Sequence, residues 1–333
     1  MDSLHHSDSR PANGRPLALL VGSPRSGTTW VGKTFDSHPD TLYRHEPDSV
    51  RRASDMPLIV ETGEYDRYAE AARVYLDATL RRRDPKTSGR LPVFPKRYYG
   101  PLRFGLRKYA VLGSKLGQRA GLSFDIPDLV PAGGDRVTTV WKSIESVGRA
   151  GLYAHVYPGM RVVHIVRHPC GHVASTLRGE KLGKFDASAP AAEDRRLFEF
   201  LLQTEVMRGR GLDWARLEKQ TAAQRLTWRW LAFNEQLMLA GERNPGITSV
   251  AYEAICEEPE ARFRELFGFC GLDWDEQTER FLQTSTGRDD GAYYSVTKDP
   301  LRAANRWRQE LDTEVVEQIL EIVKDSRVGR LFI

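Results

Sequence analysis

The 333-residue sequence has few cysteines and no long apolar run. Cys170, Cys256 and Cys270 show neither disulfide nor metal-ligand spacing, which favours a reducing compartment and predicts no metal site. No segment approaches the roughly 18 apolar residues of a membrane span, and the polar residues 1–15 lack the apolar core of a signal peptide. We therefore expect a cytoplasmic globular protein with a disordered lead-in over residues 1–15.

Buried strands alternate with helical patterns along the rest of the chain. Short apolar runs predict strands at residues 16–22, 40–47, 136–143, 160–169 and within 246–255. Helical patterns lie between them, for example at 145–157 and 221–239. This alternation predicts an α/β fold with a central, mostly parallel sheet flanked by helices on both faces, in one domain over residues 16–333.

Residues 81–119 depart from this pattern. They contain twelve lysines and arginines and one acidic residue, although the net charge of the whole chain is only +4. Prolines and glycines interrupt the segment and aromatic residues are interleaved, which predicts an irregular basic insertion. It is either a solvated surface or a rim that attracts an anionic acceptor or a membrane surface.

The stretch Val21–Trp30, VGSPRSGTTW, is typical of an anion-binding loop. Gly22 and Gly27 lie between a buried strand and a helical pattern, so backbone N–H groups and the helix dipole converge on one point. A nucleotide-triphosphate loop has a lysine where this sequence has Thr28, and a positive charge stands earlier, at Arg25. The sequence thus predicts a P-loop-like fold that binds a different phosphate-bearing ligand.

A second segment, VVHIVRHPCGHVAST, points to another phosphate site. Arg167 ends a strand, and Ser175 follows one to two turns into the next predicted helix. Both side chains are expected at the carboxyl end of the sheet, where ligands bind in open α/β folds.

Together, SPRSGTTW and IVRHPCGHVAST resemble the sulfotransferases that use 3′-phosphoadenosine 5′-phosphosulfate (PAPS). The first motif is similar to that family's 5′-phosphosulfate loop, and the second to its 3′-phosphate site. VAYEAICEEPEARFRELFGFCGL and a late basic-Trp pair extend the likeness, but the basic insertion is not covered. The resemblance implies PAPS as co-substrate, 3′-phosphoadenosine 5′-phosphate (PAP) as product, no metal, and a donor site made by Pro24, Arg25, Ser26, Gly27, Thr28, Thr29, Trp30, Arg167, Ser175, Tyr252 and Arg306.

Sulfuryl transfer needs a base to take the acceptor proton and cations to neutralise developing charge. Glu46 is the candidate base because it ends the second predicted strand, near the loop. It also follows Arg25 by 21 residues, a spacing similar to that of the base in protein-tyrosine sulfotransferases. His45 is the rival base, but on a strand it should point to the opposite face. The alternative interpretation is that Glu46 is a surface carboxylate or caps a helix.

Lys142 ends the third predicted strand, 25 residues before Arg167. The same spacing separates a catalytic lysine from the 3′-phosphate arginine in the tyrosine-directed branch, so Lys142 is expected near the transferring group together with Arg25. A surface lysine is the alternative interpretation. His164, inside a predicted strand, is interpreted as a hydrogen-bonded core residue.

We therefore predict a sulfotransferase that acts on a hydroxyl of a carbohydrate or glycolipid. Asp48 stands where the tyrosine-peptide branch has an arginine, which disfavours a peptide acceptor. Aromatic residues of the 81–119 segment suit sugars, and its cations suit an anionic acceptor or peripheral membrane contact. Alternatives are a small phenolic or lipid metabolite as acceptor, a kinase with a degenerate P-loop, and a non-catalytic anion or nucleic-acid binding protein; we predict no nucleic-acid partner.

Overall fold

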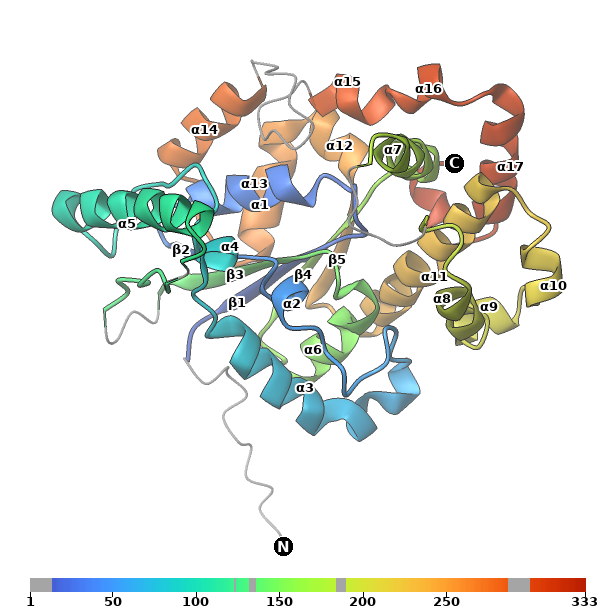
Figure 1. Cartoon of the computed structure of the whole chain (residues 1–333), viewed down its shortest axis with the longest axis horizontal. Helices are drawn as coiled ribbons and strands as arrows, with labels where there is room; N and C mark the ends of the chain where they lie inside the picture. Colours follow the sequence, from blue (N-terminus) through green and yellow to red (C-terminus); the bar gives the residue numbers. More distant parts are fainter. Residues whose placement is uncertain (1–13, 123, 132–135, 184–189, 287–299) are drawn as a thin grey trace, which may run out of the picture.

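Five parallel strands form the centre of the computed structural model, which describes residues 14–122, 124–131, 136–183, 190–286 and 300–333 (Figure 1). Their order across the sheet is β2-β3-β1-β4-β5, and every neighbouring pair is parallel. The strands are β1 (Leu17–Val21), β2 (Thr41–His45), β3 (Thr138–Ser143), β4 (Arg161–Val166) and β5 (Ile247–Ala251). The predicted α/β class and parallel sheet are confirmed. The predicted lead-in lies almost wholly outside the described residues.

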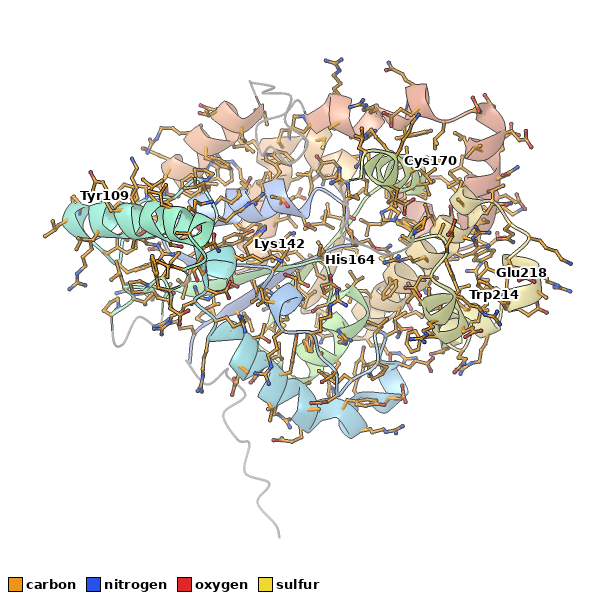
Figure 2. All side chains as sticks on the ribbon, in the orientation of Figure 1. Tyr109, Lys142, His164, Cys170, Trp214 and Glu218 are labelled. Atoms are coloured by element: carbon orange, nitrogen blue, oxygen red, sulfur yellow. The ribbon has the colours of Figure 1, made fainter. Side chains whose placement is uncertain are left out.

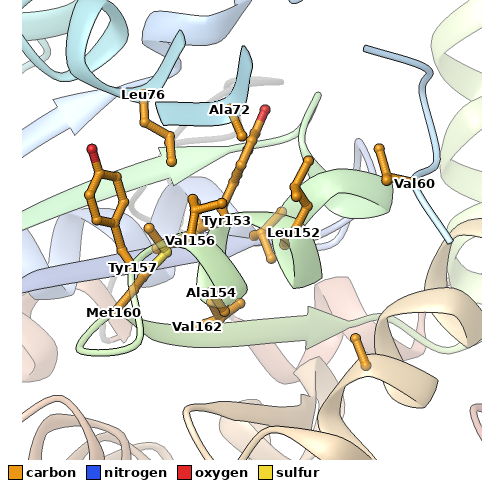
Figure 3. Packing of buried hydrophobic residues seen from close by; sticks show 14 of the residues in the cluster. Val60, Ala72, Leu76, Leu152, Tyr153, Ala154, Val156, Tyr157, Met160 and Val162 are labelled. Atoms are coloured by element: carbon orange, nitrogen blue, oxygen red, sulfur yellow. The ribbon is translucent and has the colours of Figure 1, made fainter. Parts of the chain in front are cut away.

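Helices cover both faces of the sheet because the strands are apolar on both sides. Alternate residues of β1 join different cores: Leu19 packs in one cluster and Leu20 in the other. The first face carries α3 (Tyr65–Leu80), α6 (Ala150–Val156) and α11 (Ala222–Arg243). Figure 3 shows this packing, in which Tyr153 of α6 points toward α3, where Ala72 and Leu76 lie. The opposite face carries α1 (Thr28–Ser37), α12 (Tyr252–Glu257), α13 (Pro259–Phe269) and α14 (Glu276–Thr286).

The remaining helices are mostly short. They are α2 (Pro47–Val50), α4 (Pro85–Ser88), α7 (Pro169–Lys181), α8 (Arg195–Leu201), α9 (Glu205–Arg208), α10 (Trp214–Leu217), α15 (Pro300–Asn305), α16 (Trp307–Glu310) and α17 (Thr313–Val323). Single 3₁₀ turns span Thr62–Glu64, Val147–Arg149 and Gly329–Leu331. Among the described residues no helix combines the length and apolar character needed to cross a membrane.

The prediction of an irregular segment at 81–119 is wrong for its second half. Residues Pro101–Arg119 form α5, a helix of 19 residues that projects from the body at the left of Figure 1. Pro101 occupies the first helical position, where its missing N–H costs no helical hydrogen bond. The proline that we took as a helix breaker therefore begins a helix.

Two buried lysines fix the first half of the basic segment to the core. Lys33 of α1 pairs with Asp36 and donates to the carbonyls of Arg90 (2.9 Å) and Pro92 (2.7 Å). Lys96 reaches the same Asp36 carboxylate at 3.3 Å and donates to the carbonyl of residue 38 at 2.9 Å. Buried charges persist when they are paired in this way, so residues 90–96 are held beside the site described next.

Candidate active site

The loop after β1 has the expected anion-binding geometry. Gly27 has φ of 80° and leads directly into α1, whose first residues Thr28 and Thr29 line a cavity of about 2650 Å³. A Cβ on Gly27 would lie 2.1 Å from the ring of Tyr252, so only glycine fits between this ring and the loop. The Ser26 hydroxyl, expected as a ligand donor, instead donates to Ser23 O at 2.7 Å and supports the turn.

Pro24 and Trp30, the remaining predicted residues of the loop motif, differ in role. Pro24 lines the cavity. Trp30 touches it, but its ring is 7% exposed and its Nε1 donates to Ser285 Oγ at 3.1 Å. Its ring also packs edge-on against Phe263 with centroids 5.4 Å apart. Trp30 therefore anchors α1 in the core and presents only an edge to the ligand space.

The second predicted phosphate site adjoins the loop. Arg167 follows β4, and its guanidinium donates through Nη1 to Arg25 O at 3.0 Å and through Nη2 to Ala303 O at 2.6 Å. Arg25 Nε donates to Ser175 Oγ at 3.0 Å. Because β1 and β4 are neighbours in the sheet, the loop, Arg167 and Ser175 meet at one edge. Arg167 Nε is buried and has no hydrogen-bond partner among the described residues.

Arg178 also belongs to this cluster, and the sequence reasoning missed it. It lies one turn beyond Ser175 on α7, lines the cavity, places Nη2 3.5 Å from Ser175 Oγ and pairs with Glu310. The signal was its i+3 spacing from Ser175, which puts both on one helix face. Arg306 lines the cavity as well, but its side chain is 56% exposed and pairs with Glu310 at 2.7 Å. Glu310 therefore holds two arginines at this rim.

The candidate base and the candidate lysine form an ion pair. Lys142, at the end of β3, is 1% exposed and its Nζ contacts Glu46 Oε1. The backbone joins them as well, because Glu46 N donates to Lys142 O at 2.8 Å. Both side chains line the same cavity as Thr28 and Thr29. Burial lowers the pKa of Lys142, and the Glu46 charge opposes that shift.

The expectation that His45 faces away from Glu46 is wrong. Glu46 leaves the strand in the left-handed conformation, with φ of 47°, so both side chains turn to the cavity and His45 Nε2 lies 3.9 Å from Glu46 Oε1. Its Nδ1 lies 3.0 Å from the Tyr43 hydroxyl. Burial, followed by the positive charges of Lys142 and Arg90, lowers the pKa of His45 to about 2. The imidazole is therefore neutral and weakly basic.

Among the residues that the structure describes, three non-glycine residues have positive φ: Arg25 (75°), Glu46 (47°) and Leu129 (59°). A left-handed backbone costs such residues free energy, and this strain concentrates where a side chain must be aimed. The strain thus falls on two residues that the sequence singled out for chemistry.

Asp48 lies deeper in the same cavity. One carboxylate oxygen accepts from the hydroxyls of Ser143 and Ser146, while Oδ1 is buried without a hydrogen-bond partner among the described residues. Burial raises the pKa of this carboxyl, and the two serine hydroxyls oppose the shift. Asp48 thus brings an unpaired, fully buried carboxylate oxygen to the wall of the cavity that Glu46 also lines.

The basic segment and the core contribute differently to the site. Lys86 and Arg90, and Lys115 and Gln118 of α5, line the cavity.

His164, interpreted as a core residue, is fully buried, with Nε2 2.9 Å from Asn234 Oδ1 and Nδ1 3.0 Å from Ser249 Oγ. Within the described ranges no cluster of three or more histidine, cysteine or acidic side chains is arranged to hold a metal ion.

Comparisons with known proteins bear on the identity of this site. A model of the sulfotransferase family matches residues 16–276. A search of curated proteins found no match. Among solved structures, the sulfotransferase domain of the Synechococcus PCC 7002 olefin synthase is 14% identical, with 93% of this chain and 95% of that chain covered and a TM-score of 0.45.

Two further solved structures are similar at the same level. Sulfotransferase STF9 from Mycobacterium avium is 15% identical, with 96% of this chain and 79% of that chain covered and a TM-score of 0.43. Mouse sulfotransferase SULT7A1 complexed with PAP is 13% identical, with 97% and 90% covered and a TM-score of 0.42. The family model spans most of the chain, including every predicted site residue except Arg306. On this evidence the chain belongs to the sulfotransferase family.

Proposed function

We propose that the protein transfers the sulfuryl group of PAPS to an acceptor hydroxyl, giving a sulfate ester and PAP. The observation that carries this proposal is the Glu46–Lys142 ion pair, which lines the same cavity as the Gly27 loop. The pair supplies a base and a cation next to an anion-binding helix start. Sulfuryl transfer to a hydroxyl needs these three elements together.

The chain's own groups fit a donor with two separate anionic ends. The start of α1, with Thr28 and Thr29, suits the phosphosulfate end. The buried Arg167 Nε, without a partner among the described residues, suits the other phosphate together with Ser175. Tyr252, whose ring covers Gly27 and lies 5.8 Å from the Arg167 guanidinium, separates the two ends.

The chemistry assigns distinct tasks to Glu46 and Lys142. Glu46 takes the proton of the acceptor hydroxyl as the new O–S bond forms. Lys142 neutralises charge on the sulfuryl oxygens and on the phosphate oxygen that leaves as the old S–O bond breaks. In the ion pair the Glu46 carboxylate is engaged by the Lys142 ammonium. Lys142 must therefore release Glu46 when the reactants bind, so that the carboxylate can accept the proton of the acceptor hydroxyl. The neutral His45, with its pKa of about 2, is a weak base.

A carbohydrate or glycolipid hydroxyl is the proposed acceptor. Asp48, with its unpartnered buried oxygen, supplies an acceptor for a sugar hydroxyl. Tyr75 and Phe233 line the same cavity and offer apolar faces for a sugar ring. A small phenolic metabolite is the second candidate, because the same aromatic faces would hold a phenol. Cytoplasmic location stays a prediction.

Donor binding is tested with Arg25→Ala and the exposed control Arg73→Ala. PAP at about a hundredfold excess over its Kd should stabilise the wild type and the control by about 2.7 kcal/mol. Arg25→Ala should lose most of this shift and its turnover of PAPS. Unchanged stabilisation together with full activity in Arg25→Ala would exclude the loop as the donor site.

The assignment of the base is tested with Glu46→Gln. The variant should keep PAP binding and lose roughly 10²–10⁴-fold in rate, the usual size of a general-base contribution. Acceptors are screened with labelled PAPS, starting from sugars and phenols. EDTA separates the kinase alternative, since phosphotransfer from ATP needs Mg²⁺ and transfer from PAPS does not. An unchanged rate in Glu46→Gln moves the role of base to His45.

A further inference from the structure

Helix α5 presents its apolar face to solvent. Seven of the fourteen exposed large apolar side chains among the described residues lie between residues 102 and 124. On α5 they are Leu102 (79% exposed), Leu106 (60%), Tyr109 (74%), Leu112 (39%) and Leu116 (65%), spaced so that they share one helix face. Val111, on the opposite face, is fully buried. Monomeric proteins rarely leave such a stripe uncovered.

Cations flank this stripe. Arg103 and Lys108 are exposed on α5, one on each side of the apolar face by their helical positions. The helix also contains Arg107, Lys115 and Arg119, and it has no aspartate or glutamate. An exposed apolar face bordered by lysine and arginine is the pattern of a helix that lies in the interface of an anionic bilayer.

The position of α5 links this surface to the cavity. Figure 2 shows Tyr109 on the projecting helix, while Lys142 lies at the centre of the molecule. Lys115 and Gln118, in the last turns of α5, line the cavity that holds Glu46 and Lys142. A convex, projecting helix can sink into lipid headgroups, whereas a protein partner would need a matching groove.

We propose that α5 is a docking helix that lies on the surface of an anionic lipid bilayer, with Leu102, Leu106 and Tyr109 in the interface. Lipid phosphates would neutralise Arg103 and Lys108. Docking there would hold the cavity, which Lys115 and Gln118 line from the other side of α5, near the membrane surface and near hydroxyl groups of lipid-linked acceptors. Only this last consequence rests on the proposed function, because the docking surface contains none of the residues assigned to chemistry.

The experiment is flotation of the full-length protein with phosphatidylcholine vesicles, with and without phosphatidylglycerol. The wild type should float with phosphatidylglycerol vesicles and be released as salt rises from about 0.1 M to about 1 M, where charge screening shortens from ~10 Å to ~3 Å. The triple variant Leu102→Ser/Leu106→Ser/Tyr109→Ser should bind at least about tenfold more weakly. Val74→Ser, an exposed apolar position on α3, is the matched control and should bind as the wild type does.

A second variant separates charge from folding. Arg103→Glu/Lys108→Glu keeps the apolar face and should also lose binding to phosphatidylglycerol vesicles, with an unchanged melting temperature. Equal flotation of both variants and the wild type, or equal binding to both vesicle types, would overturn the proposal. A wild-type dimer that becomes a monomer in the triple variant would assign the face to a second copy instead. Vesicle binding without any PAPS turnover would refute the proposed function and leave the docking helix standing.

Discussion

Replacing Lys142 with methionine tests whether the Glu46–Lys142 pair is a coupled unit. Methionine keeps most of the apolar stem, which packs near Gly32 of α1, and removes the ammonium. Leaving one partner of a fully buried pair uncompensated costs about 3–5 kcal/mol. Lys142 is 1% exposed, but the Glu46 side chain is 15% exposed and faces an open cavity, so water can solvate it partly. We therefore expect a loss of about 2–3 kcal/mol in the free energy of unfolding.

The double variant Lys142→Met/Glu46→Gln carries the decisive information. With both charges gone, no ionised group is left unpaired, so most of the loss should be recovered. Urea unfolding of the four proteins gives the coupling energy directly, and we expect the double variant to be about 1–2 kcal/mol more stable than Lys142→Met alone. PAPS turnover should stay low in all three variants, because each lacks the base or the cation.

The control and the refuting result are both simple. Lys324→Met removes an exposed lysine that pairs with Glu321 on the surface, and its stability should stay close to that of the wild type. If the effects of Lys142→Met and Glu46→Gln on unfolding add without coupling, the pair does not act as a unit. The assigned division of charge in the site would then be wrong.

Three further outcomes follow from local geometry and burial. Gly27→Ala should lower the free energy of unfolding by about 2–4 kcal/mol and weaken PAP binding, since the new methyl group meets the Tyr252 ring at a residue with positive φ. The control Gly105→Ala, on α5 with open space around it, should raise the free energy of unfolding by up to about 1 kcal/mol. Thermal unfolding measures both. Burial raises the pKa of Glu253 to about 7, so its contribution to stability is present at low pH and is lost as pH rises from about 4.5 to 7. Urea unfolding of Glu253→Gln should show a flatter dependence over that window, and an unchanged slope would contradict the assignment. His45→Gln should leave the pH dependence of kcat unchanged between pH 5 and 9, because the imidazole with its pKa of about 2 does not titrate there; loss of a titration step in that range would make His45 the base.

The sheet could be predicted from the sequence because parallel strands buried on both faces are continuous apolar runs. LALLV at Leu17–Val21 is fully buried, as that pattern indicates. Helix α5 could not be predicted in the same way. Its leucines and Tyr109 face solvent, not a core, and Pro101 and three internal glycines suggest a break. The rule that the apolar face of a helix packs against the protein core does not hold for α5, whose apolar face we propose to dock on a bilayer.

The site shows the same division between local and tertiary information. The loop, Arg167 and Ser175 were identified from motifs, because their local order is nearly fixed by strand, turn and helix. The meeting of Arg25 with Ser175, and of Glu46 with Lys142, depends on which strands are neighbours. Strand order is tertiary information. The orientation of His45 was mispredicted for a local reason, since one left-handed residue after a strand cancels its alternation.

The missing lysine of the loop has a structural counterpart on the next strand. β3 lies beside β1, with Leu20 opposite Lys142 in the register, so a lysine at the end of β3 lines the same cavity as the start of α1. A lysine at Thr28 would be fixed to the loop and to the donor alone. Lys142 is instead shared with Glu46, which couples the cation to the base. Under the proposed roles, Lys142 releases the base Glu46 when the reactants bind. A cation on a neighbouring strand suits that task better than one inside the loop, because its ion pair can then respond to both the donor and the acceptor.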